Sequence, residues 1–203
     1  MMKLLYTVNS PYARKVRVVA IEKHIEMTLE EVVLAAPDCP VKQYNPLGKV
    51  PVLVLSDGGS LYDSRVIVEY LDNRTPLAHL IPTENGSKID VRRWEALADG
   101  VTDAAVAVML EQRKPAELQD AAYITKHMDK VSCGLATLDQ DLAKNKWCVN
   151  GVFSLADIAI GCLLGYLDLR FNHLNLQAEH PNLSKLYSEL MKRESFKTTM
   201  PVA

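Results

Sequence analysis

The chain has 203 residues, of which 48% are hydrophobic and 24% charged, enough apolar sequence to bury one core or two small ones. Its 23 basic and 25 acidic residues give a net charge of -2, which provides no overall positive field for nucleic acid or an acidic membrane. No apolar run approaches the ~18 residues of a membrane span, and the N-terminus lacks the apolar stretch of a signal peptide. These properties predict a soluble cytoplasmic protein that binds neither nucleic acid nor membrane.

The cysteines and histidines show no spacing that is typical of a metal site or a redox dithiol. No two cysteines form a CxxC pair, and no two histidines stand close together in the sequence. We therefore expect no metal, and we expect the cysteines to behave as small apolar residues. The residues are Cys39, Cys133, Cys148, Cys162, His24, His79, His127, His173 and His180.

The first third of the chain alternates the patterns of strands and helices. A proline at position 11 stands in the first turn of the first helix, where a missing N–H costs nothing. The turn Ser56-Asp57-Gly58-Gly59 separates two short apolar runs and predicts a hairpin. The strands are expected at 3–8, 27–34, 52–55 and 60–62, and the helices at 11–23 and 64–73. The order is therefore β-α-β followed by β-β-α.

Between 75 and 87 the composition changes to prolines and polar residues, which is typical of a linker. No strand pattern returns beyond it, and the remaining periodic segments have helical spacing. The expected helices are 89–113, 116–144, 154–169 and 183–193. The sequence thus predicts an α/β domain at 1–78 followed by an all-helical domain at 84–203.

One helix start is especially clear. Ser154-Leu155-Ala156-Asp157 resembles a capping box with aspartate in place of the usual glutamate, and Phe153 and Ile158 occupy the positions of a hydrophobic staple. The helix that follows is apolar nearly all round and is expected in the core. Ser154 and Asp157 are therefore expected to be structural.

The segment before the third strand has a different character. A proline directly before a strand cannot donate to the ladder, so Pro51 marks the edge of the strand at 52–55. A cis bond at Pro51 would turn the amide and carbonyl of Val50 outward, where they can bond an extended ligand like an added strand. An ordinary turn before a strand is the alternative interpretation.

Taken together, these features resemble the cytosolic glutathione S-transferase superfamily. They are the X-Pro before the third strand, the Asp63-Ser64 pair that opens a helix, the linker, the Ser-x-x-Asp core helix and the ending from His180-Pro181 onward. The resemblance covers essentially the whole chain and is greatest to bacterial YibF-type homologues. It implies a thioredoxin-like N-terminal domain that binds glutathione, followed by an all-helical domain that supplies the pocket of the second substrate.

The resemblance also implies a role for individual residues. Val50, before the expected cis-proline Pro51, pairs its backbone with the cysteinyl part of glutathione. Ser64 meets the γ-glutamyl carboxylate at a helix N-terminus, and Asp63, one methylene shorter than the family's glutamate, meets the nearby amine. Lys49 is placed to meet the glycine carboxylate, with an exposed, solvated lysine as the alternative.

Catalysis in this family requires a thiolate, and a free thiol with a pKa near ~8.5 is only slightly ionised at neutral pH. Ser10 matches the position of the catalytic hydroxyl in serine-type members, and Asn9 offers an amide donor to the same sulfur. Ser10 can also serve as the N-cap of the helix at 11–23, and the two roles are compatible. Whether Ser10 or Asn9 activates the thiol stays open.

The resemblance implies glutathione as a co-substrate with no resident cofactor, an unidentified small electrophile or peroxide as second substrate, and a homodimer that acts in detoxification. Thiol transfer is a possible side activity. One alternative is a non-catalytic interaction module with the same fold. The other is a glutathione-dependent disulfide reductase, which is disfavoured because Ser10 stands where the nucleophilic cysteine would be.

Overall fold

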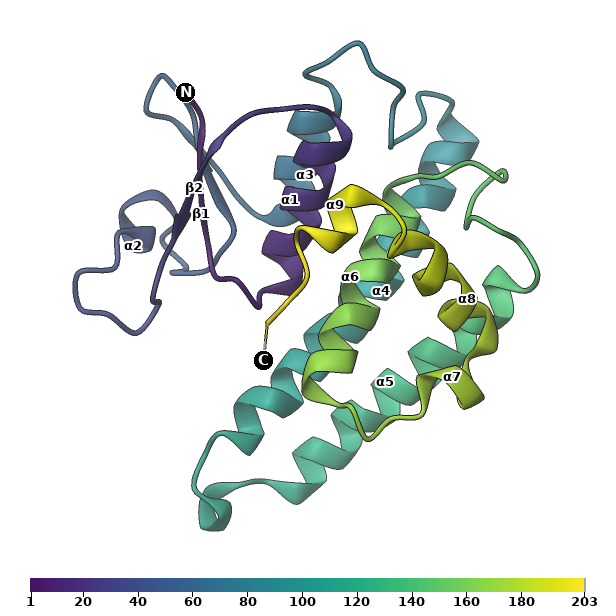
Figure 1. Cartoon of the computed structure of the whole chain (residues 1–203). Helices are drawn as coiled ribbons and strands as arrows, with labels where there is room; N and C mark the ends of the chain where they lie inside the picture. Colours follow the sequence, from purple (N-terminus) through teal and green to yellow (C-terminus); the bar gives the residue numbers. More distant parts are fainter. Residues whose placement is uncertain (203) are drawn as a thin grey trace. The chain divides into compact units, whose positions relative to one another are not determined.

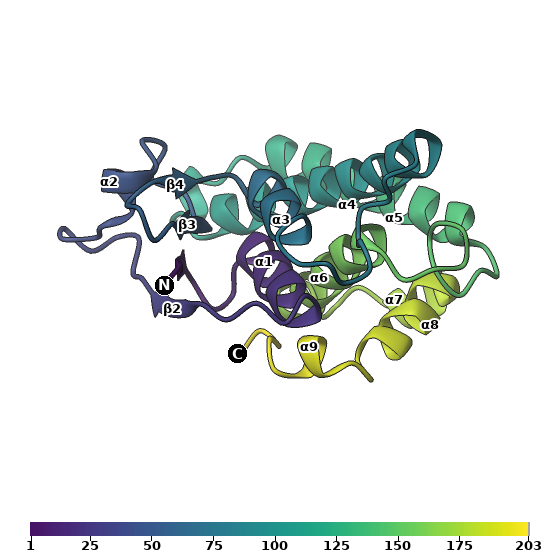
Figure 2. The ribbon, with the colours of Figure 1, turned by 90° about the horizontal axis from the view of Figure 1, so that it is seen from above.

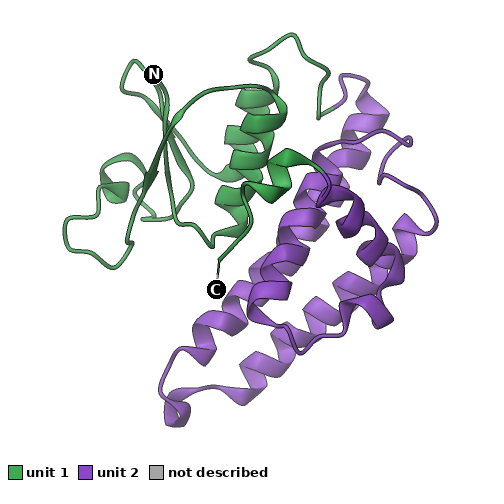
Figure 3. Cartoon of the chain, viewed as in Figure 1, with its two compact units in different colours: residues 1–81, 193–203 green, residues 82–192 purple. Residues whose placement is uncertain are grey.

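A computed structural model describes residues 1–202, and these form two compact units (Figure 3). The first unit contains Met1–Ile81 together with the chain from Arg193 onward, and the second contains Pro82–Lys192. The last stretch of the described chain therefore belongs to the N-terminal unit.

The first unit is built on a four-stranded mixed sheet. Its strands are β1 (Lys3–Tyr6), β2 (Thr28–Glu31), β3 (Val52–Val54) and β4 (Ser60–Leu61), in the spatial order β2-β1-β3-β4. β1 is parallel to β2 and antiparallel to β3, and β3 is antiparallel to β4. The crossover between the parallel strands runs through helix α1 (Pro11–Glu22), as a parallel pair requires.

Helices cover both faces of this sheet. α1 packs against α3 (Ser64–Asp72) on one face, and the single turn α2 (Val41–Tyr44) lies on the other (Figures 1 and 2). Strand residues point alternately to the two faces. Consecutive residues such as Leu4 and Leu5 are both buried, so both faces are apolar. Leu5, Val52 and Val54 pack with Val32 and Val41 in one buried cluster. A further short helix of this unit is α9 (Glu194–Lys197).

The second unit is helical. It contains α4 (Asn85–Gln112), a 3₁₀ turn at Ala116–Leu118, α5 (Ala121–Leu142), α6 (Leu155–Arg170), α7 (Leu176–Glu179) and α8 (Pro181–Leu190). α4 packs against α5 and α6, and α8 packs against α5 and α6. Every residue of 155–167 in α6 is buried, which explains its almost wholly apolar sequence. None of the helices in the described chain has the length and apolarity needed to cross a membrane.

The sequence predicted all the long elements but missed the single-turn helices α2, α7 and α9, which are too short for a periodic signal. The strand predicted at 27–34 is shorter, because only Thr28–Glu31 pairs with β1. Helix α4 begins earlier than predicted, inside the expected linker. There Glu84 acts as the N-cap, and its carboxylate accepts hydrogen bonds from the N–H groups of Gly86 and Ser87.

A glycine allows the close approach of α4 and α5. A Cβ placed on Gly134 would lie 2.2 Å from Cγ2 of Val101, so Gly134→Ala forces the two helices apart. We expect it to lower the free energy of unfolding by about 1–3 kcal/mol in urea denaturation. Gly100→Ala is the control, because a Cβ there meets nothing within 4 Å and should stabilise α4 by up to ~1 kcal/mol. Equal stability of the two variants would contradict this account of the packing.

Candidate functional site

The register of the sheet brings three segments of the first unit to one edge. β1 and β3 are antiparallel with Leu5 opposite Val52, so the segment after β1 lies beside the segment before β3. β4 is antiparallel to β3 with Leu61 opposite Leu53, so the segment after β4 lies at the same edge. The seven residues that the sequence analysis selected all stand in these segments: Asn9, Ser10, Lys49, Val50, Pro51, Asp63 and Ser64.

The central segment presents an unpaired backbone. The Val50–Pro51 peptide bond is cis, and the ladder between β3 and β1 starts only at Val52. Within residues 1–202, neither the N–H nor the C=O of Val50 makes a hydrogen bond. Lys49 beside it is exposed. This edge can therefore accept an extended chain through a pair of main-chain hydrogen bonds.

A buried amide holds this segment in place. The side chain of Asn45 donates from Nδ2 to the carbonyl of Lys49 at 2.9 Å and accepts at Oδ1 from the N–H of Leu47 at 3.0 Å. Gly48 completes the turn with φ +62°, a conformation that favours glycine. Sequence reasoning did not assign Asn45 a role, although the Asn-Pro-Leu-Gly pattern is a turn signal.

The third segment ends at the N-terminus of α3. Asp63 is the N-cap, and its Oδ1 accepts a hydrogen bond from the N–H of Arg65 at 2.9 Å. Ser64, the first residue of the helix, is buried, yet its hydroxyl bonds to no other described residue. A helix N-terminus with an available hydroxyl is suited to a carboxylate, because the amides and the dipole favour negative charge.

The first segment leads into α1. Ser10 is the N-cap, as the sequence allowed, and its Oγ accepts a hydrogen bond from the N–H of Ala13 at 3.2 Å. Because that oxygen acts as an acceptor, the hydroxyl hydrogen remains available to another group. Asn9 accepts a hydrogen bond at Oδ1 from the N–H of Val202 at 2.9 Å, which leaves its Nδ2 group as a donor.

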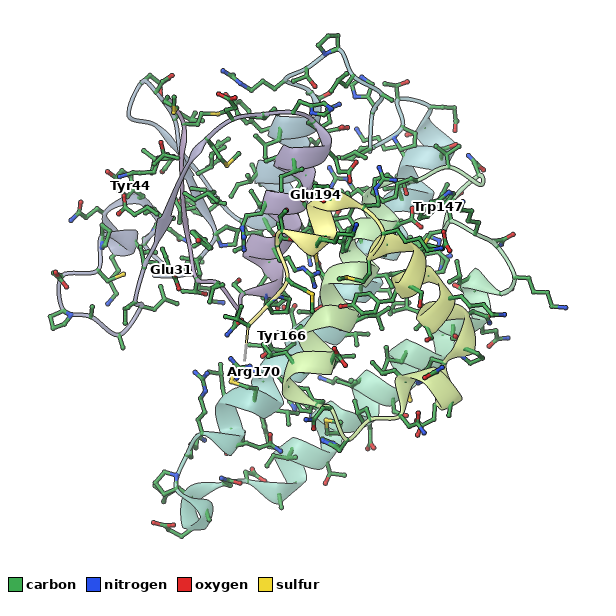
Figure 4. The ribbon with its side chains drawn as sticks, in the orientation of Figure 1. Glu31, Tyr44, Trp147, Tyr166, Arg170 and Glu194 are labelled. Atoms are coloured by element: carbon green, nitrogen blue, oxygen red, sulfur yellow. The ribbon has the colours of Figure 1, made fainter. Side chains whose placement is uncertain are left out.

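The helical unit contains one polar group that sequence reasoning missed. The Tyr166 side chain in α6 is buried, and its hydroxyl has no hydrogen-bond partner within 1–202. Burial raises the pKa of Tyr166, although the charges of Arg170 and Arg113 act in the opposite direction. Arg170 follows Tyr166 by four residues on the same helix (Figure 4). A buried hydroxyl without a partner has no sequence signal, since tyrosine is common in cores.

The part of the chain that the structure describes contains no cluster of three or more histidine, cysteine or acidic residues that could hold a metal ion. The four cysteines are free thiols. Burial raises the pKa of the Cys148 thiol, so this sulfur stays protonated and is a poor nucleophile.

Both parts of the chain match family models. Residues 9–74 match the N-terminal domain of glutathione S-transferases, and residues 97–194 match the C-terminal domain. The first matched region includes all seven selected residues, and the second includes the capped helix α6.

Similar proteins cover the whole chain. A GST-like protein of Escherichia coli K12, YibF, is 36% identical over 98% of both chains. A crystal structure of a glutathione S-transferase from Methylobacillus flagellatus KT with GSH bound is 64% identical, covers 100% of both chains and has a TM-score of 0.98. A glutathione transferase family member from Pseudomonas fluorescens Pf-5, with bound S-(propanoic acid)-glutathione, is 34% identical over 100% of both chains, with a TM-score of 0.89.

Proposed function

The chain belongs to the glutathione S-transferase family, and on that premise we propose that it binds glutathione at the edge of the sheet and activates its thiol. The single observation that carries the proposal is the register, which gathers the three segments around Val50–Pro51. Relatives with GSH or an S-substituted glutathione bound support the choice of ligand.

Each segment takes one part of the tripeptide. The unpaired N–H and C=O of Val50 bond the cysteinyl residue as an added strand would. The N-terminus of α3 with the Ser64 hydroxyl receives the γ-glutamyl carboxylate, and Asp63 receives the adjacent amine through the carboxylate oxygen that Arg65 does not use. Lys49 is exposed near Val50 and meets the glycine carboxylate.

The chemistry is the loss of the thiol proton to solvent and the attack of the resulting thiolate on an electrophile. With a carbon electrophile, a sulfur–carbon bond forms while the electrophile expels a leaving group, or while an activated double bond opens and takes up a proton from solvent. The product is an S-substituted glutathione, the kind of molecule held by the Pseudomonas relative. The available hydroxyl hydrogen of Ser10 and the Nδ2 group of Asn9 both stabilise the anion by hydrogen bonding. The proposal includes a cytoplasmic location and a homodimer, which is the usual state of the family. Analytical sedimentation at the working protein concentration tests the homodimer.

The proposal predicts that two serines have separable roles. Ser64→Ala should weaken glutathione binding in calorimetry by roughly 10- to 100-fold, because a hydrogen bond to a charged group contributes about 1.5–3 kcal/mol. Ser10→Ala should instead raise the pKa of the bound thiol by about one to two units in an absorbance titration, with a much smaller change in affinity. Ser56→Ala, in the exposed hairpin turn, is the control and should change neither quantity.

Two outcomes would contradict these assignments. Unchanged affinity in Ser64→Ala would remove Ser64 from the site. A bound-thiol pKa that stays constant in Ser10→Ala but rises in Asn9→Ala would make Ser10 only a helix cap. A protein that binds glutathione but never lowers the pKa of its thiol would be the non-catalytic interaction module instead.

A further inference from the structure

The last residues of the chain lie along helix α1 of the first unit (Figures 1 and 2). We call residues 193–202 the C-terminal segment. It packs antiparallel to α1, because its first residue contacts the end of the helix and its last contacts the residue before the N-cap. Arg193 donates from Nε and Nη2 to the two carboxylate oxygens of Glu22 at 2.8 and 2.6 Å, and Val202 contacts Asn9.

The middle of this segment is anchored by buried side chains. The Arg14 guanidinium donates to the carbonyl of Phe196 at 3.2 Å and to Oγ1 of Thr199 at 3.4 Å, and it lies over the Phe196 ring. Phe196 is 0% exposed and Thr199 is 1% exposed. Arg17 adds a hydrogen bond to the carbonyl of Thr198 at 3.4 Å. The segment is therefore fixed on α1 by packing as well as by hydrogen bonds.

The anchor at Glu22 is charged at neutral pH. Burial opposes ionisation of this carboxyl, but the hydrogen bonds from Arg193 and Ser195 outweigh it and hold the pKa of Glu22 below its ordinary value. Its contribution to stability is thus fully present above the unfolded pKa of 4.5 and is lost as the pH falls through the lower folded pKa.

The end of the segment determines the orientation of one amide. A backbone N–H can only donate, so the Asn9 atom at 2.9 Å from the Val202 nitrogen must be the oxygen. The Nδ2 group is then the other branch of the amide, and it donates to no acceptor among residues 1–202. An exposed asparagine without such a contact would be free to populate both orientations of its amide.

We propose that the backbone N–H of Val202 is a positioning group, which holds the Asn9 amide so that its Nδ2 donor stays available to the glutathione sulfur. This inference rests on the proposed function, since it concerns the same bound thiol. It connects the two ends of the chain, 193 residues apart, through one hydrogen bond. It also gives the C-terminal segment a role in catalysis without contact between that segment and the substrate.

The size of the effect can be bounded. If the amide populated both orientations equally, the competent fraction would halve, and the pKa of the bound thiol would rise by about 0.3 unit. If the donor were lost altogether, the rise would match that of Asn9→Ala, roughly one to two units. A variant that lacks the Val202 N–H should fall between these limits.

Val202→Pro removes the N–H while it preserves chain length and charge, and Val202→Ala preserves the N–H as the matched control. In an absorbance titration of the glutathione complex, we expect Val202→Pro to raise the pKa of the bound thiol by about 0.3 to 1 unit and Val202→Ala to leave it in place. The double variant Asn9→Ala with Val202→Pro should show the same pKa as Asn9→Ala alone, because Val202 acts only through Asn9.

The inference is overturned if Val202→Pro leaves the pKa of the bound thiol at the wild-type value or shifts it equally with and without Asn9. Calorimetry on the same variants separates this failure from a failure of the proposed function, which would appear as no glutathione binding in the wild-type protein. The side-chain amide resonances of Asn9 in the free protein give a second readout. They should move in Val202→Pro and not in Val202→Ala, and identical resonances in all three proteins would also overturn the inference.

Discussion

Replacing Asp157 with alanine is expected to lower the free energy of unfolding by roughly 3–5 kcal/mol, because several buried donors lose their acceptor at about 1–3 kcal/mol each. The carboxylate is 0% exposed. Its Oδ2 accepts from the N–H of Ser154 at 2.8 Å and from the Ser154 hydroxyl at 3.1 Å, and its Oδ1 accepts from the N–H of Cys148 at 2.9 Å. The residue thus ties the preceding loop to the start of α6.

Urea denaturation followed by circular dichroism measures this loss. Asp168→Ala is the matched control, because Asp168 is an exposed aspartate on the same helix and its removal should change stability by less than about 0.5 kcal/mol. Asp157→Asn, which retains one acceptor oxygen, should lie between the two. If Asp157→Ala and Asp168→Ala unfolded at the same urea concentration, the capping box would not stabilise the helical unit.

The sequence predicted part of this arrangement. Ser154 and Asp157 are three residues apart, so their reciprocal hydrogen bonds follow from local spacing, and the structure confirms the capping box. The bond from Cys148 to the same carboxylate depends on how the loop before the helix folds back. No local sequence pattern encodes this folding of the loop, and Cys148 was therefore expected only to be a small apolar residue.

The same distinction applies to the candidate site. The order of the strands along the chain was predicted from periodicity. Once β1, β3 and β4 are paired, their register brings the segments that contain Ser10, Val50 and Ser64 together. The family comparisons confirm the thioredoxin-like and helical domains that the resemblance implied. The roles of the individual residues stay predictions, since hydrogen-bond geometry toward a ligand is not encoded in spacing.

What the sequence did not predict are contacts between distant residues. The bond between Asn9 and Val202 joins opposite ends of the chain, and nothing near Asn9 indicates it. The buried pair of Lys23 and Asp72 is a second example, because both residues stand at predicted helix ends where an exposed charge is the usual expectation. Such pairs become visible only when the helices have been packed.

The pair of Lys23 and Asp72 leads to the second large effect. The Lys23 Nζ lies 3.1 Å from Oδ1 of Asp72, and the side chains are 1% and 2% exposed. Lys23 also donates to the carbonyls of Leu77 and Ala78, at 3.0 and 3.2 Å. The two charges therefore join the ends of α1 and α3 to the chain that follows α3.

Lys23→Met should destabilise the protein by about 3–5 kcal/mol, because it leaves the buried Asp72 carboxylate without the Lys23 ammonium. The His79 ring, whose Nδ1 lies 3.3 Å from Oδ2 of Asp72, remains beside the carboxylate but is itself partly exposed. Urea denaturation measures the loss, and Lys42→Met, at an exposed lysine, is the control. The penalty comes from the unpaired charge and not from lost packing, since methionine fills much of the same volume.

A double variant tests that interpretation. In the wild-type structure, the N–H groups of Leu80 and Ile81 donate to the Asp72 carboxylate at 2.9 and 3.0 Å. Asp72→Asn removes the charge but retains one oxygen that can accept from either N–H. Lys23→Met combined with Asp72→Asn should therefore be more stable than Lys23→Met alone, with a coupling energy of about 1–3 kcal/mol. If the losses of unfolding free energy in Lys23→Met and Asp72→Asn simply add in the double variant, the ion pair contributes nothing to stability. The burial of Lys23 would then reflect only the packing of its aliphatic stem.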